Sequence, residues 1–137
     1  MSERASRWEL GYRPLLFVLW LLELGAAAYY SLLPAAQLGG IPGSDKVWHC
    51  AGYAMLAVPL PLLFRKPRLL WFAALGLIAF GVLLEFCQEY VPGRSFELAD
   101  MLANSAGVIA AVIVVGRMES MRQSRWARIA IGNSSAD

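Results

Sequence analysis

The stretch EFCQEYVPGRSFELADMLAN, residues 85–104, joins two apolar runs and decides how the chain folds. Its first half places three polar residues at i, i+3 and i+4, on one face of a helix: Glu85, Gln88 and Glu89. A Pro-Gly-Arg turn at 92–94 follows and carries one fixed positive charge. Its second half opens another apolar run, with Asp100 and Asn104 at i and i+4. The sequence therefore predicts two apolar helices whose polar groups meet at their junction.

The composition of the chain is that of a membrane protein. Of the 137 residues, 58% are hydrophobic and 16% are charged, and the mean hydropathy is +0.53. A soluble domain has about 25% charged residues. The net charge is only +2. Nucleic-acid-binding proteins usually carry a strongly basic stripe, so this modest charge argues against nucleic acid as a partner. Cys50 and Cys87 lie in apolar runs without metal-type spacing, which favours small buried side chains over ligands or disulfides.

Four apolar runs predict an all-α bundle of four transmembrane helices. We place these helices at about 14–33, 46–64, 69–90 and 98–116, within a single membrane domain over 1–137 and before a basic cytoplasmic tail at 117–137. Pro59 and Pro61 predict a kink in the second helix, and Ser44 or Asp45 predicts its N-cap. Residues 132–137 are expected to be disordered, and the start of the tail can form an interfacial amphipathic helix.

The first run also resembles a secretory signal peptide, because Ala26-Ala27-Ala28 imitates a small-residue cleavage site. Glu23 interrupts the apolar core of such a signal, and the run continues past the site. These two features favour a retained transmembrane helix. Glu23 is then near the midplane of the membrane. Its side chain can be a neutral carboxylic acid hydrogen-bonded between helices, a proton-sensitive site, or a partner of His49 or Asn104.

Basic residues set the expected orientation. Ten of them lie in the N-terminal segment, the 65–68 loop and the tail, and the other two are Lys46 and Arg94. The positive-inside rule places the ten in the cytoplasm, together with both termini. The loops at 34–46 and 91–99 are then on the outer face.

This orientation brings polar residues of three helices to one depth. His49 lies about 6 Å below Asp45, Asn104 about 6 Å below Asp100, and Glu85 about 7 Å below the end of its helix, at 1.5 Å per residue. A ring lies above them: Asp45, Lys46, Glu89, Arg94 and Asp100. We expect pairing of Glu85 with His49, and of Arg94 with Glu89 or Asp100. Either a network that holds the helices together or an outward-facing polar pocket results; the size of the group favours the pocket.

Two motifs give the chain a family resemblance. Asp45-Lys46-Val-Trp-His49-Cys-Ala-Gly-Tyr53 resembles the D-K-x-x-H-x-x-x-Y signature of the VanZ-like family. Residues 85–107 resemble its E-x-x-Q-x-x-x-P-G-R-x-x-x-x-x-D-x-x-x-N-x-x-G signature. The resemblance covers about half of the chain and implies a small, multi-pass protein of the bacterial inner membrane with four helices. The family's founding member is associated with glycopeptide resistance, so the resemblance implies a role in cell-envelope or glycopeptide-related processes, without assigned catalytic residues.

The motif positions are the candidates for ligand binding: Asp45, Lys46, His49, Tyr53, Glu85, Gln88, Arg94, Asp100 and Asn104. One function is binding of a lipid headgroup or a wall-precursor group in the outward pocket. Another is an intramembrane acid–base or metal-assisted enzyme on a lipid-linked phosphate or ester, with catalytic candidates His49, Glu85, Glu89 and Arg94. A third, transport, requires an oligomer. No metal-ligand set or cofactor is assigned, although carboxylates with one imidazole are compatible with Mg²⁺ or Mn²⁺. The expected partners are the bilayer and a lipid-linked or cell-wall ligand, and no nucleic acid.

Overall fold

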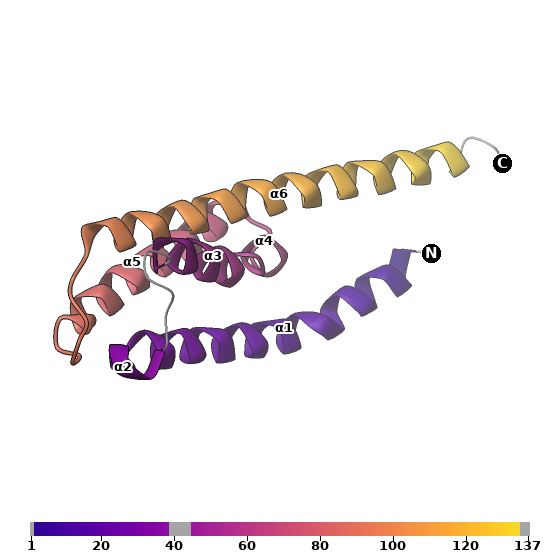
Figure 1. Ribbon diagram of the computed structural model, residues 1–137. Coiled ribbons are helices and arrows are strands. Elements are labelled where there is room, and N and C mark those ends of the chain that lie inside the picture. Colours follow the sequence, from indigo (N-terminus) through magenta and orange to yellow (C-terminus); the bar gives the residue numbers. More distant parts are fainter. Residues whose placement is uncertain (1, 39–44, 135–137) are drawn as a thin grey trace.

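The computed structural model describes residues 2–38 and 45–134, and every element within these residues is a helix. The elements are α1 (Ser2–Ser31), α2 (Ala35–Leu38), α3 (Asp45–Ala57), α4 (Leu60–Leu63), α5 (Pro67–Gln88) and α6 (Leu98–Ser134). Figure 1 shows α3 between α1 and α6, with α2 and the α5–α6 turn at one end of the molecule. The beginning of α1 and the end of α6 lie at the opposite end. Both chain ends therefore lie on the same side.

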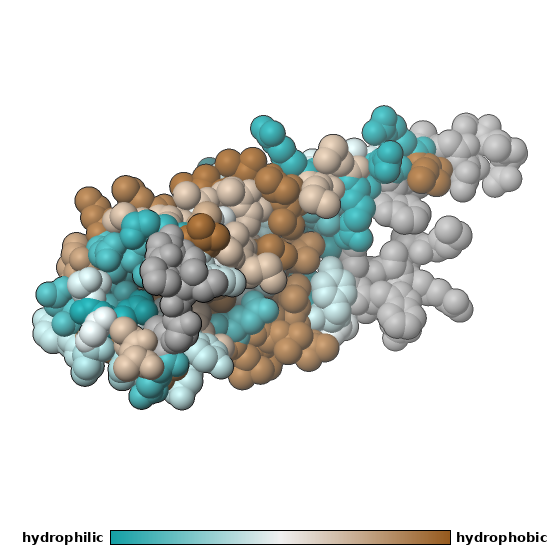
Figure 2. Space-filling model, in the orientation of Figure 1, coloured by the Kyte–Doolittle hydropathy of each residue, from teal (hydrophilic) through white to brown (hydrophobic). Residues whose placement is uncertain are grey.

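Among the described residues, three helices are long and apolar enough to cross a membrane. The spans are Gly11–Ser31, Pro67–Gln88 and Leu98–Arg125. Large apolar side chains remain exposed along these helices, among them Leu22, Phe72 and Leu102. Figure 2 shows apolar residues over the middle of the molecule and hydrophilic residues at the end that carries α2 and the α5–α6 turn. An apolar belt between polar ends is what a bilayer requires, so the chain is an all-α membrane protein.

The run at 46–64, which the sequence predicts as one helix kinked at its prolines, is interrupted. The run forms α3, of 13 residues, and α4, of four, which are separated at Val58 and Pro59. Proline has no backbone N–H to donate to the preceding turn; Pro59 lies in this interruption, and Pro61 lies in the first turn of α4. The two prolines thus divide the run instead of only bending it. Whether α3 and α4 together make the fourth span stays a prediction.

Side chains of α1 satisfy backbone carbonyls at this break. Trp20 Nε1 donates to the carbonyl of Leu56 at 2.9 Å, near the end of α3. Arg13 Nη2 donates to the carbonyl of Leu63 at 2.5 Å, at the end of α4. Proline breaks inside a membrane are tolerated where a neighbouring helix provides such donors. These two contacts attach α1 to the α3–α4 run.

The polar ends of the chain are more helical than the sequence predicts. α1 begins at Ser2, and α6 continues through the basic tail to Ser134, so the expected disorder at 132–134 is wrong. Pro14 lies inside α1 where the polar segment meets the apolar span, and Gly116 lies at the corresponding place in α6, yet both helices continue through these positions. Of the loop predicted at 34–46, residues 35–38 form α2, and residues 39–44, with Ser44 as a possible cap, lie outside the described residues, as do residues 135–137.

The packed core lies among α3, α4, α5 and α6. Its buried side chains include Leu56, Leu60, Leu77 and Val108. α3 crosses α6 at very short range because Gly107 has no side chain: a Cβ there would overlap the carbonyl oxygen of Cys50. Small residues allow helices in membranes to approach in this way. The crossing places the first turns of α3 beside the first turns of α6.

Candidate functional site

The buried polar side chains of the described residues all come from one short stretch. They are Glu85, Gln88, Asp100 and Asn104, and each is at most 6% exposed. They belong to the last turn of α5 and the first two turns of α6. In a bilayer protein such groups turn inward because lipid offers them no hydrogen bonds. The stretch at 85–104 is therefore the polar interior of the protein.

The α5–α6 turn is held against the end of α1 and the start of α2. Gly93 has a φ of +75°, which favours glycine, and its backbone lies against Ala35. The amide of Ala35 donates to the carbonyl of Pro92 at 3.3 Å. Gln88 Nε2 donates to the carbonyl of Ser31 at 3.0 Å. Gln88 thus has a structural contact and does not line the cavity described below.

His49 joins α3 to α6 through both ring nitrogens. Its Nδ1 lies 3.1 Å from Asn104 Oδ1, and its Nε2 lies 3.6 Å from Asp100 Oδ2. The amide oxygen of Asn104 can only accept, so Nδ1 carries the proton of this hydrogen bond. Nε2 therefore faces the Asp100 carboxylate. The contact between His49 and Asn104 is the one that their matching depth predicts.

Lys46 lies one turn before His49 and binds two carboxylates of the α6 N-terminus. Its Nζ lies 2.8 Å from Glu97 Oε2 and 3.4 Å from Asp100 Oδ1. The hydrogen bond from Lys46 lowers the pKa of Glu97 below its usual value. Acidic groups are also favourable at the first turn of a helix, where the backbone N–H groups point outward. Sequence reasoning did not select Glu97, because a contact across 51 positions leaves no periodic signal.

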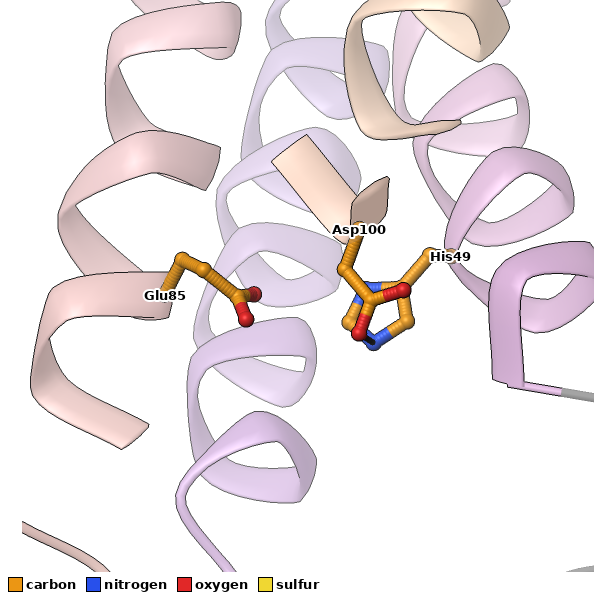
Figure 3. A group of neighbouring side chains, drawn as sticks. All are labelled: His49, Glu85 and Asp100. Carbon is orange, nitrogen blue, oxygen red and sulfur yellow. Dashed lines mark ion pairs between the residues drawn. The ribbon is translucent and has the colours of Figure 1, made fainter. Parts of the chain in front are cut away.

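Glu85 approaches the same place from α5. Its Oε1 accepts the backbone N–H of Glu97 at 2.9 Å, which orients the carboxylate. His49, Glu85 and Asp100 each offer a ligand atom, and these atoms all lie within 4.8 Å of one another. Figure 3 shows the three side chains, from α3, α5 and α6, pointing toward one another. We call these three residues the acid–histidine cluster.

The Tyr53 hydroxyl lies beside this cluster. Tyr53 is one turn below His49 on α3, and its ring packs against Gly81, where an added Cβ would be 2.8 Å from the ring. The residue is 5% exposed, and its hydroxyl has no hydrogen-bond partner among the described residues. It is close enough to Glu85 to interact with that carboxylate electrostatically.

A cavity of about 560 Å³ opens between α1 and α3, next to the cluster. Apolar and aromatic residues form most of its wall, including Ala27, Tyr30 and Trp48. Its polar lining consists of Glu23, Ser31, Asp45, His49, Tyr53 and Arg94. Glu23 is exposed on this side of α1, and no hydrogen bond joins it to His49 or Asn104. The cavity therefore combines an oily wall with charged groups of both signs.

The charged residues pair with other partners than the sequence predicts. Arg94 makes no ion pair with Glu89 or Asp100; Lys46 and His49 hold Asp100 instead. Glu89 Oε2 accepts the backbone N–H of Phe96 at 3.1 Å. His49 pairs with Asp100 more closely than with Glu85, since both lie at the α3–α6 crossing. The guanidinium of Arg94 thus lines the cavity without either expected carboxylate.

Comparison with known proteins identifies the family of the chain from its sequence. No curated protein and no solved structure matches it. The VanZ/LLP1 family model matches residues 15–118, which include both motifs, all of α3, α4 and α5, and the apolar half of α6. This match covers well over half of the chain. The protein is therefore a member of the VanZ/LLP1 family.

Proposed function

We propose that this protein binds the anionic headgroup of an envelope lipid or lipid-linked wall precursor in the cavity between α1 and α3. The observation that carries the proposal is the position of Arg94. Its guanidinium lines an otherwise mostly apolar cavity and makes no ion pair with Glu89 or Asp100. Guanidinium groups bind phosphate and carboxylate through paired hydrogen bonds. The protein would act in the bacterial inner membrane, with this site at the outer leaflet.

The remaining motif residues fit this function in two ways. Asp45 and Tyr53 line the cavity and offer hydrogen bonds to hydroxyl or amide groups of a ligand, whereas His49 lines it with both ring nitrogens turned to α6. Lys46, Gln88 and Asn104 are engaged with Glu97, Ser31 and His49, respectively. We assign these three to holding the walls of the site. The apolar face of α1 provides contact area for an acyl or prenyl chain.

The experiment compares matched lipids on the protein in nanodiscs of neutral lipid. Native mass spectrometry measures retention of a prenyl phosphate, phosphatidylglycerol, and the prenol and diacylglycerol that lack the phosphate. We expect both phosphate lipids to bind more tightly than their neutral counterparts. Preference for the prenyl phosphate indicates a wall-precursor carrier, and preference for phosphatidylglycerol indicates a bilayer headgroup.

Arg94→Gln removes the charge and keeps a hydrogen-bonding side chain. Loss of one charge-assisted contact corresponds to about tenfold weaker binding of the phosphate lipid. Arg68→Gln, in the first turn of α5, is the matched control and should bind as the wild type does. Equal retention of charged and neutral lipids, or an unchanged Arg94→Gln variant, would contradict the proposal.

A second candidate function is hydrolysis of a lipid-linked phosphate or ester. It is favoured by the acid–histidine cluster, whose imidazole and two carboxylates suit acid–base or metal-assisted chemistry. Turnover of a prenyl phosphate that is lost in Glu85→Gln would establish it. Binding of the prenyl phosphate without turnover, in the presence of Mg²⁺ and Mn²⁺, would exclude hydrolysis and support only the binding function.

A further inference from the structure

We propose that His49, Glu85 and Asp100 bind a single divalent cation, for which Mn²⁺ is the suitable probe. The site lies where α3, α5 and α6 meet, beside the cavity and separate from Arg94. It is independent of the proposed lipid binding, because none of its ligand atoms is needed to hold an anion.

The geometry of the three residues is close to that of a coordination sphere. Their ligand atoms lie within 4.8 Å of one another, and His49 Nε2 is 3.6 Å from Asp100 Oδ2. Ligand atoms around a cation with bonds of about 2.1 Å are separated by about 3.0–3.4 Å. Small side-chain rotations close the remaining difference. The 3.6 Å separation is too long for a hydrogen bond between the two atoms.

The hydrogen bonds around the cluster prepare it for a cation. Asn104 Oδ1 accepts a hydrogen bond from His49 Nδ1–H, which leaves Nε2 as the ligand nitrogen of the neutral ring. The Glu97 backbone N–H holds one oxygen of Glu85, and Lys46 lies near Asp100 Oδ1, so Oδ2 is directed to His49. Such outer contacts orient the ligands of metal sites.

A buried group gives independent support. The Tyr53 hydroxyl has no hydrogen-bond partner among the described residues, although the residue is about 95% buried. Tyr53 lies within electrostatic range of Glu85. Buried polar groups are otherwise almost always satisfied, and a hydrated cation would supply a bound water for the hydroxyl. A cation would also offset the repulsion between the buried carboxylates of Glu85 and Asp100.

One imidazole with two carboxylates selects the class of ion. Oxygen ligands favour Mg²⁺ and Mn²⁺, and the single nitrogen shifts the preference from Mg²⁺ toward first-row metals. Mn²⁺ accepts both donor types, and it can be detected directly. The alternative occupant of the space between Nε2 and Oδ2 is a proton, which makes His49 an imidazolium paired with Asp100.

The experiment titrates Mn²⁺ into the purified full-length protein and follows the free-ion electron paramagnetic resonance signal. We expect one saturable site per chain below about 1 mM. Electron spin-echo modulation of the bound ion should show a directly coordinated ¹⁴N. Binding without nitrogen modulation, or no saturable binding in this range, would overturn the proposal and leave the imidazolium–carboxylate pair.

Variants identify the ligands and separate this site from the lipid site. Asp100→Asn and Glu85→Gln keep the hydrogen-bonding shape and should weaken Mn²⁺ binding at least about tenfold. Glu89→Gln removes a nearby carboxylate outside the cluster and is the matched control. Arg94→Gln should retain the Mn²⁺ site while losing the phosphate lipid. Wild-type Mn²⁺ affinity in Asp100→Asn would contradict the assignment, and the nitrogen signal of the wild type tests it even if a variant fails to fold.

Discussion

His49 Nδ1 lies 3.1 Å from Asn104 Oδ1, across 55 positions of sequence, and this contact joins the motif at 45–53 to the motif at 85–107 in one site. The contact is possible because α3 and α6 cross closely at Gly107. It fixes the imidazole between the amide of Asn104 and the carboxylate of Asp100. The orientation of His49 is therefore a consequence of helix packing.

Replacing Asn104 with Leu should destabilise the protein and release the ring of His49. The change leaves the buried Nδ1–H without an acceptor, which costs about 1–3 kcal/mol. Thermal unfolding in detergent measures the loss, and a double-mutant cycle with His49→Leu should give a coupling of about 1 kcal/mol. Ser105→Ala, which removes a hydroxyl that bonds within α6 itself, is the control. Additive effects of the two Leu variants would show that the side chains do not interact.

Replacing Gly107 with Ala should be among the most damaging single changes in the chain. The added methyl group meets the Cys50 carbonyl and comes within 3.0 Å of the Ala54 nitrogen, both backbone atoms that cannot rotate away. Overpacking of this kind costs about 3 kcal/mol. Gly116→Ala, on the same helix with nothing within 4 Å, should instead stabilise by about 0.5–1 kcal/mol through helix propensity. Equal stabilities of the two variants would refute the close α3–α6 crossing.

Trp20→Phe should weaken the attachment of α1. It keeps an aromatic ring beside Phe64 but removes the donor to the Leu56 carbonyl. The expected loss is about 1 kcal/mol, measured by thermal unfolding. Trp71→Phe, which alters an exposed tryptophan of α5, should change stability little. If both changes cost the same, the indole contact does not stabilise the break between α3 and α4.

The ion pair of Lys46 and Glu97 should give stability a defined dependence on pH. The hydrogen bond from Lys46 lowers the pKa of Glu97 in the folded protein. A lowered folded pKa contributes stability that is fully present above the usual pKa, about 4.3, and is lost as the pH falls through the lowered value. The difference in unfolding temperature between wild type and Glu97→Gln should therefore be constant near neutrality and shrink in acid. A difference in unfolding temperature that grows on acidification would contradict a lowered pKa of Glu97 in the folded protein.

The common side of the two chain ends makes topology testable. The excess of basic residues in the terminal segments and the 65–68 loop predicts that these segments lie in the cytoplasm. A phosphatase fused after Arg94 should then be active, and one fused after Lys66 should be silent. The opposite pattern would mean that the cluster and the cavity lie on the cytoplasmic face. The site could then reach only lipids of the inner leaflet.

The sequence by itself determined the environment of this protein and the members of its polar group. Runs of apolar residues reveal membrane helices because lipid excludes charges over a fixed thickness, and this signal is local. Helical spacing put Glu85 and Gln88 on one face, and matching depth joined His49 to Asn104. Family motifs pointed to the same residues. Each of these inferences depends only on the spacing of residues along single helices, which can be read directly from the sequence.

Only the tertiary structure decided which of these groups touch. Arg94 faces the cavity, whereas Lys46 holds Glu97 and Asp100, because the α3–α6 crossing and the turn at Gly93 set the approach of each side chain. The contacts of α1 with this run, from Trp20 and Arg13 to the carbonyls of Leu56 and Leu63, likewise depend on how the helices pack. Contacts between helices arise from packing across many positions, and helix periodicity records the face of a residue but not the partner that covers it.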